Sequence, residues 1–406
     1  MFHVCKLCSN FVSLMGAYKY LYCFLACVLV SCQGEKKQEL TPWGSTLQAS
    51  ADSVSTDYTF NDILNNGEII MLTLSGPQTY YEYHGRGLGT QYLLCEKFAQ
   101  SIGVSLRVEV CRDTAELVKR LRNGEGDIAA LPLPHSTRGV KFCGVRYPKE
   151  QTSWAVEESN TALADTLNKW FRPALITQIA KEQEFVLSTR SITRHVYSPM
   201  LDSRAGIISK YDHLFQKYAP VARVDWRLMA AQCYQESTFD PRARSWAGAC
   251  GLMQIMPETA DHIGIPRAQL YEPESNIAAA AKYIDQLNSR FRDVPDKMER
   301  ISFVLASYNG GYHHIRDAMA LAHKYGRNQH SWRDVSGYVL GLRDPRYYTD
   351  PIVKYGYMRG GETVDYVERI HVRWAQYRGS ASVSTFKGAY GSLEPQRATK
   401  KYRFHL

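Results

Sequence analysis

Residues 225–241 have the sequence DWRLMAAQCYQESTFDP. Asp225 is a suitable N-cap for a helix, because its carboxylate can accept a hydrogen bond from a free backbone N–H group of the first turn. Met229 and Cys233 follow at helical spacing, and Glu236 lies on the same apolar face. A carboxyl group held against apolar neighbours keeps its proton to a higher pH, as a general acid near neutral pH requires. Glu236 is therefore the first candidate for a catalytic residue, although a buried structural glutamate paired with an arginine would give the same pattern.

Glu236 begins the first of four short sequence motifs, called blocks here, that follow one another along the chain. Residues 236–241 read ESTFDP, residues 251–257 read GLMQIMP, residues 306–311 read ASYNGG and residues 362–367 read ETVDYV. In this order the four blocks resemble the signature of the lysozyme-like lytic transglycosylases, with one additional serine in the third block. One block could arise by chance, but four in order over about 130 residues are specific.

This resemblance implies an all-α lysozyme-like C-terminal domain that acts on the glycan strands of peptidoglycan. In that family the matching glutamate, here Glu236, protonates the glycosidic oxygen of the MurNAc-GlcNAc β-1,4 bond. It then deprotonates the C6 hydroxyl of the muramic acid, and the product is a 1,6-anhydro-MurNAc end. A usual glycoside hydrolase needs two carboxylates, and the best second candidate, Glu362, is not the nucleophile in this family.

The same blocks supply the candidate substrate-binding residues. Amide, hydroxyl and aromatic side chains can hydrogen-bond sugar hydroxyls or stack on a sugar face. Gly251 and Gly310 are expected to let the backbone approach the sugar closely. Tyr366 is expected to hydrogen-bond the catalytic carboxyl group. The full set of candidates is Ser237, Met253, Gln254, Tyr308, Asn309 and Tyr366.

Residues 58–200 alternate between strand and helix patterns, which predicts an α/β domain with a parallel sheet. The predicted strands are residues 68–74, 104–110 and 128–133, and the predicted helices are residues 88–102 and 114–123. By contrast, residues 201–379 show helical patterns and no convincing strand. One of these helices is expected to be capped by Ser275 and Asn276.

The α/β region is similar to the first lobe of amino-acid-type periplasmic binding domains, a domain fused to a transglycosylase in the membrane-bound lytic transglycosylase F type. Arg138 matches the arginine that binds a ligand carboxylate in such domains. Residues 152–156 already have the pattern of the strand that returns to the first lobe, so no second lobe has room to form. We therefore expect a single-lobe periplasmic-binding-like domain with weak or absent affinity for a solute.

The N-terminus has the pattern of a lipoprotein signal peptide at residues 1–31. A short apolar run, which is too short to span a membrane, ends in Leu29-Val30-Ser31-Cys32. Cys32 would carry the lipid, and residues 32–57 would form a polar tether. We expect a periplasm-facing protein attached through this lipid to the outer membrane of a Gram-negative bacterium. The alternative is a buried apolar N-terminus with a chance cysteine.

Composition limits the remaining classes. The net charge is +9, and residues 380–406 form a basic tail that is expected to be solvated. No nucleic-acid-binding module is recognisable. No cofactor or metal site is predicted, because the adjacent His313 and His314 would point in different directions on a helix. The five cysteines that follow Cys32 allow disulfides that the sequence cannot assign.

Two alternatives remain open at this stage. The first is a goose-lysozyme-like muramidase, a hydrolase that would use the same fold and the same Glu236. The second is an inactive glycan-binding lipoprotein, which the intact Glu236, Gln254 and Tyr308 argue against.

Overall fold

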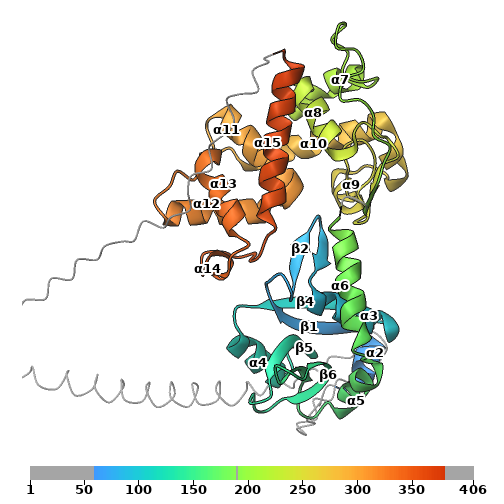
Figure 1. Cartoon of the computed structure of the whole chain (residues 1–406), viewed down its shortest axis with the longest axis vertical. Helices are drawn as coiled ribbons and strands as arrows, with labels where there is room; N and C mark the ends of the chain where they lie inside the picture. The colour runs from blue at the N-terminus through green and yellow to red at the C-terminus, as the bar shows by residue number, and fades with distance from the viewer. Residues whose placement is uncertain (1–58, 189–190, 380–406) are drawn as a thin grey trace, which may run out of the picture. The chain divides into compact units, whose positions relative to one another are not determined.

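The computed structural model describes residues 59–188 and 191–379 (Figure 1). The predicted signal peptide, the predicted lipid attachment at Cys32, the predicted tether and the predicted basic tail lie outside these residues. None of the helices in the described ranges is long and apolar enough to cross a membrane.

The first half contains one five-stranded sheet with the strand order β4-β1-β5-β7-β6. Its strands are β1 (Glu68–Leu74), β4 (Ser105–Cys111), β5 (Ile128–Pro134), β6 (Lys141–Tyr147) and β7 (Thr152–Val156). The helices are α2 (Phe60–Asn66), α3 (Thr90–Ser101), α4 (Thr114–Arg122), α5 (Thr161–Trp170) and α6 (Ala174–Val186). Strand β7 lies inside this sheet, so the described residues of this half contain a single α/β lobe, as expected.

The sheet is mixed, which corrects the prediction of a parallel sheet. Strands β4, β1 and β5 run parallel, whereas β7 pairs antiparallel with both β5 and β6. Only four residues, 148–151, connect β6 to β7. A connection this short can join antiparallel neighbours but cannot make the crossover that parallel strands need.

Helices cover both faces of the sheet (Figure 1). Successive side chains of a strand point to opposite faces. Accordingly, Met71 packs in a core with α2, α3, α5 and α6, whereas the next residue, Leu72, packs in a second core with α4. Asp127, just before β5, accepts a hydrogen bond of 2.7 Å from the backbone of Ile70 and so has a structural role.

A two-stranded hairpin was not predicted from the sequence. It consists of β2 (Tyr81–Tyr83) and β3 (Arg86–Leu88). The two residues between them, His84 and Gly85, both have a positive φ, of 49° and 71°. Tight hairpins require this conformation, but histidine is not a usual residue for it, so the turn carried a weak signal.

The second half is helical around one large hydrophobic core. Its helices are α7 (Asp212–Ala222), α8 (Trp226–Ser237), α9 (Pro257–Ile263), η2 (Arg267–Tyr271), α10 (Pro273–Arg290), α11 (Lys297–Gly310), α12 (Tyr312–Lys324), α13 (Trp332–Gly341), α14 (Pro345–Tyr348) and α15 (Gly360–Tyr377). One short strand, β9 (Arg244–Ser245), pairs with β8 (Ile192–Thr193), which the sequence had not indicated. The five described cysteines are buried and free of disulfides.

The predicted cap of α10 is wrong by one turn. The helix begins at Pro273, after the N-cap residue Glu272. Proline favours the first position of a helix, because its missing N–H group would have no partner there. Asn276 is therefore inside the helix and fully buried, where it has another role described below.

Candidate active site

Helix α8 positions Glu236 as the sequence predicts. The carboxylate of Asp225 accepts a hydrogen bond of 2.9 Å from the backbone N–H of Arg227 and so caps the helix. Met229 and Cys233 are fully buried on the face that continues to Glu236. Thr238, with a φ of 53°, ends the helix in the left-handed conformation.

The carboxyl group of Glu236 is bonded to a tyrosine that lies 130 residues further along the chain. The hydroxyl of Tyr366, on α15, donates a hydrogen bond of 2.6 Å to Glu236 Oε1. Burial raises the pKa of Glu236 to about 7, while this hydrogen bond and the charge of Arg194 act in the opposite direction. Near neutral pH Glu236 can therefore both donate and recover a proton.

Glu236 lies in the wall of a cavity of about 730 Å³. Four of the predicted substrate-binding residues share this wall: Gln254, Tyr308, Asn309 and Tyr366. A cavity of this size is within the range that holds a small ligand or a few sugar rings. The predicted residues thus converge from α8, α11, α15 and the segment that precedes α9.

Ser237 and Met253 do not line the cavity, because both are fully buried in the core. The hydroxyl of Ser237 donates to the backbone oxygen of Cys233, within the same helix. The contribution of Met253 to the site comes through its backbone, since its carbonyl accepts a 2.7 Å hydrogen bond from the Tyr308 hydroxyl. Both residues thus reach the site only through other groups.

The two motif glycines lie where a side chain would collide with neighbouring parts of the protein. A side chain at Gly251, which has a φ of +75°, would collide with the backbone oxygen of Leu270 and with Asn276. At Gly310 a side chain would collide with Met358 and Thr363. Both glycines thus permit close packing of the protein on itself. Gly251 lies outside the cavity wall, whereas Gly310 also lines the cavity.

Asn276 is a residue of the site that the sequence analysis missed. Its side-chain oxygen accepts a 2.7 Å hydrogen bond from the backbone N–H of Met253. Its amide nitrogen donates to the backbone oxygens of Cys250 and Leu270, at 3.0 and 2.7 Å. Asn276 therefore holds the turn that leads to Gln254. The sequence signal for this role was the position of Asn276, a polar residue next to Ile277 at the start of the apolar face of the helix.

Glu362, the best second carboxylate in the sequence, also lies in the cavity wall. Its Oε1 accepts hydrogen bonds of 2.9 and 2.6 Å from the guanidinium of Arg359, and its Oε2 accepts one from the hydroxyl of Tyr83. Asp240 is a turn residue, since its carboxylate accepts from the backbone of His195 and Arg242. Both carboxylates are thus engaged by protein donors.

The hairpin adds residues to the cavity wall that sequence reasoning did not find. Tyr83 lines the cavity, and its ring lies nearly parallel to that of Trp246, with centroids 6.2 Å apart. His313, also in the wall, stacks on Tyr355 at 4.3 Å. Across the two described ranges, no group of three or more His, Cys, Asp or Glu residues could hold a metal ion. Arg138 is exposed on the α/β half, outside this wall.

A family model described as the transglycosylase SLT domain matches the helical half. The match extends over residues 213–331, which are thus similar to a transglycosylase SLT domain. The matched residues include Glu236, Gln254, Tyr308 and Asn309, whereas Tyr366 lies beyond them.

Several relatives of the chain are named membrane-bound lytic murein transglycosylase F. The protein from Desulfosudis oleivorans is 31% identical over 67% of this chain and 61% of its own length. The protein from Aeromonas hydrophila is 28% identical over 76% of this chain and 82% of its own length. The protein from Yersinia pestis is 40% identical over 63% of this chain and 53% of its own length. The chain thus spans less than two thirds of the length of the relatives from Desulfosudis oleivorans and Yersinia pestis.

Two solved structures show limited similarity to parts of the chain. An inactive mutant of the lytic transglycosylase Slt from Pseudomonas aeruginosa is 26% identical over 42% of this chain and 24% of its own, with a TM-score of 0.28. The arginine-bound form of domain 1 from TmArgBP is 18% identical over 29% of this chain and 97% of its own, with a TM-score of 0.25.

Proposed function

We propose that the chain is a peptidoglycan lytic transglycosylase that cleaves the MurNAc-GlcNAc β-1,4 bond and leaves 1,6-anhydro-MurNAc ends. The observation that carries this proposal is the state of Glu236. Its carboxyl group lies in the wall of a large cavity, is held by Tyr366 and has a pKa of about 7. The SLT domain around it, and relatives named lytic murein transglycosylases, support the same activity.

One carboxyl group is enough for this reaction. Protonated Glu236 donates its proton to the glycosidic oxygen as the bond from that oxygen to C1 of the muramic acid breaks. The resulting carboxylate then accepts the proton of the C6 hydroxyl, whose oxygen forms a new bond to C1. The proton that enters the leaving sugar is replaced from the same substrate, so no water is consumed and Glu236 returns to its starting form.

We infer direct glycan contacts for the polar side chains of the cavity wall, Gln254, Tyr308 and Asn309. Ser237 and Met253 would act from the core, because their side chains are buried. Met253 would do so through the hydrogen bond between its carbonyl and Tyr308. The goose-lysozyme-like muramidase is the alternative on this fold, and it would require a water molecule in place of the C6 hydroxyl.

The membrane-bound relatives support a membrane-associated, periplasm-facing location. We propose that a signal peptide at residues 1–31 is removed and that Cys32 then carries the lipid that links the protein to the membrane. Residues 32–57 would form a tether. The α/β domain at 58–200 would then precede the catalytic domain at 201–379 and the tail at 380–406. The first of these domains is proposed to lack an enclosed solute site, because it has one lobe.

Substitution of Glu236 by glutamine tests this function. The Glu236→Gln variant should fold normally and lose glycan cleavage by at least about 10²–10⁴-fold, because an amide cannot donate and recover the proton. The measurement is the release of soluble muropeptides from purified sacculi. Glu272→Gln is the matched comparison and should keep most of the activity, because Glu272 is exposed and outside the cavity wall. Release at the wild-type rate by Glu236→Gln would refute the proposed function.

A further inference from the structure

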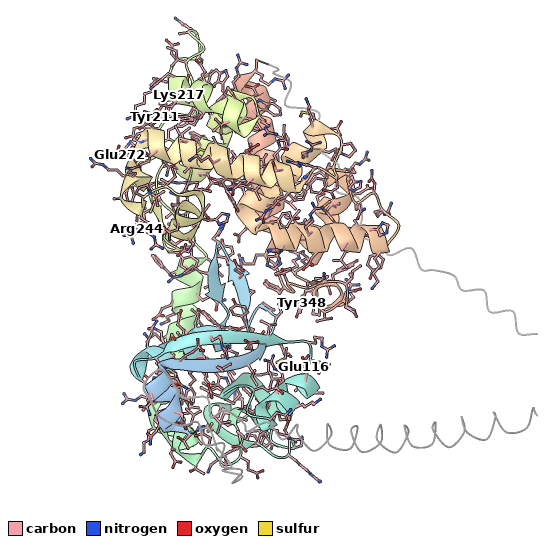
Figure 2. All side chains as sticks on the ribbon, turned by 180° about the vertical axis from the view of Figure 1, so that it is seen from behind. Glu116, Tyr211, Lys217, Arg244, Glu272 and Tyr348 are labelled. Atoms are coloured by element: carbon pink, nitrogen blue, oxygen red, sulfur yellow. The ribbon has the colours of Figure 1, made fainter. Side chains whose placement is uncertain are left out.

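The segment before the SLT domain is bonded to the end of the catalytic helix. We call residues 192–195 the helix clamp. Within it, β8 (Ile192–Thr193) pairs antiparallel with Arg244 and Ser245 of β9. Arg244 is labelled in Figure 2. The sequence pattern places these residues in the first domain, and the SLT match begins only at residue 213.

The helix clamp stabilises an unusual turn directly after Glu236. Thr238 and Phe239 have φ values of 53° and 63°, a conformation that side-chain-bearing residues rarely adopt. The backbone N–H of His195 donates a 2.6 Å hydrogen bond to the carboxylate of Asp240. The hydroxyl of Thr238 donates one of 2.8 Å to the backbone oxygen of His195. Two such residues in succession need this kind of support from surrounding structure.

Arg194 links the helix clamp to Glu236 itself. Its Nη1 donates a hydrogen bond of 3.2 Å to the backbone oxygen of Glu236. This carbonyl belongs to the last turn of α8, where the backbone has no helical partner and a cation is favourable. The guanidinium also brings a positive charge close to the Glu236 carboxyl group, and this charge acts to lower the pKa of that group.

The other titratable groups that face this carboxyl are uncharged near neutral pH. They come from the two packed helices and from α8 itself, and burial raises the pKa of each of them: Tyr366, Tyr308 and Cys233. Helix α15 presents Glu362, Asp365 and Arg369 elsewhere in the cavity wall. Among the groups that act directly on the Glu236 carboxyl, Arg194 thus supplies the positive charge.

We propose that Arg194 is a positioning residue for Glu236, which fixes the end of the catalytic helix and keeps a positive charge beside the carboxyl group. The working catalytic unit then begins before Ile192 rather than at the start of the SLT match. This proposal rests on the proposed role of Glu236 as the acid and base of the reaction.

The test compares Arg194→Gln and Arg194→Lys in the full chain. Arg242→Gln is the control, because Arg242 is an exposed arginine nearby whose side chain is outside the cavity wall. The titration of Glu236 is followed by carboxyl carbon-13 NMR, with the signal assigned by its loss in Glu236→Gln. Muropeptide release is measured over the same pH range, and circular dichroism checks the fold.

In Arg194→Gln, Glu236 should titrate at higher pH, and the alkaline limb of the activity profile should move up with it. Turnover at the optimum should fall about 10-fold to 100-fold, because the carboxyl group loses its alignment. Arg194→Lys should restore the titration of Glu236 through its charge, and the control should match the wild type.

A folded Arg194→Gln variant with unchanged Glu236 titration would overturn the proposal. The same upward shift of the Glu236 titration in Arg194→Lys as in Arg194→Gln would also overturn it. If the wild type itself releases no muropeptides, the proposed function fails while the NMR titration still reports on Arg194.

Discussion

The protonation of Glu236 results from opposing influences on one side chain. Burial disfavours the carboxylate, whereas the Tyr366 hydroxyl and the charge of Arg194 favour it. Burial is the largest of these, and the pKa is raised to about 7. A buried carboxyl group without these two partners would keep its proton at neutral pH and could not act as a base. A carboxyl group exposed to water would lose its proton well below neutral pH and could not act as an acid. The surroundings of Glu236 thus keep both roles accessible.

This raised pKa also makes a prediction about stability. The folded state keeps the Glu236 proton up to about pH 7, whereas the unfolded state releases it near pH 4.5. Since the folded state binds more protons in this window, its stability falls as the pH rises from about 4.5 to 7. Glu236→Gln should therefore unfold at higher temperature than the wild type at pH 8, with a gain of roughly 1–3 kcal/mol.

Thermal unfolding of both proteins across the pH range measures this gain. The difference between them should shrink on acidification, because below pH 4.5 both states of the wild type are protonated. The ionic composition is held constant throughout. A difference that stays the same from pH 4 to pH 8 would show that Glu236 is not the group responsible.

Individual site residues differed in how far the sequence could predict them. Helical spacing and the motif identified Glu236, and the motif indicated its contact with Tyr366, which periodicity could not have done. No pattern in the sequence indicated that the side chains of Ser237 and Met253 would face the core rather than the cavity. Arg194 was missed because its contact is with a backbone oxygen, and such contacts leave no pattern in the sequence.

At the scale of secondary-structure elements, the turn at residues 250–254 links the core to the cavity. Gln254 adopts a positive φ of 48°, and its side-chain amide donates hydrogen bonds to the backbone oxygens of Ala243 and Gly251. Asn276 holds the same turn from α10 through three hydrogen bonds to the backbone. The position of the cavity wall at Gln254 and Tyr308 therefore depends on a helix that does not itself carry a catalytic group.

Replacement of Asn276 by leucine should destabilise the protein and reduce its activity together. It would leave the N–H of Met253 and the oxygens of Cys250 and Leu270 buried without this partner, at a cost of about 1–3 kcal/mol for each group left unsatisfied. The expected result is a clearly lower unfolding temperature, with reduced muropeptide release even where the protein remains folded.

Asn288→Leu provides the matched control on the same helix. Asn288 is half-buried and outside the cavity wall, so its substitution should change the stability by less than about 1 kcal/mol. If Asn276→Leu and Asn288→Leu unfold at the same temperature, Asn276 does not hold the turn as described.

The secondary structure itself was predicted best where a pattern was long and regular. Residues 68–74 were predicted as a strand and form β1 with the same bounds. The mixed direction of the sheet was missed, because strand direction depends on connections rather than on the alternation of apolar residues. The cap of α10 was misplaced because Ser275 and Asn276 have suitable side chains, while Pro273 had already fixed the start of the helix.

At the scale of the whole molecule, the order of the two halves and the single lobe of the first were both predicted. The lack of room for a second lobe could be read from the short distance between residues 138 and 152. The contact of residues 192–195 with the catalytic helix could not be predicted from the sequence, because it joins segments about 45 residues apart that share no repeating pattern.

Membrane attachment through Cys32 is a prediction at this scale. Cys32→Ala should release the protein from the membrane fraction or block removal of the signal peptide, because a lipid chain can no longer be attached. Membrane fractionation and the mass of the mature N-terminus provide the measurements. A mature N-terminus well downstream of Cys32, without an acyl mass, would contradict the anchor.

The origin of the oxygen at the cleaved end tests the central claim most directly. Sacculi are digested in water enriched in oxygen-18, and the new muramic acid ends are analysed by mass spectrometry. If the C6 hydroxyl of the substrate attacks C1, as proposed for Glu236 catalysis, the ends are 1,6-anhydro sugars and contain no labelled oxygen. If the enzyme is a hydrolase, each new reducing end contains one labelled oxygen, and that result would contradict the account.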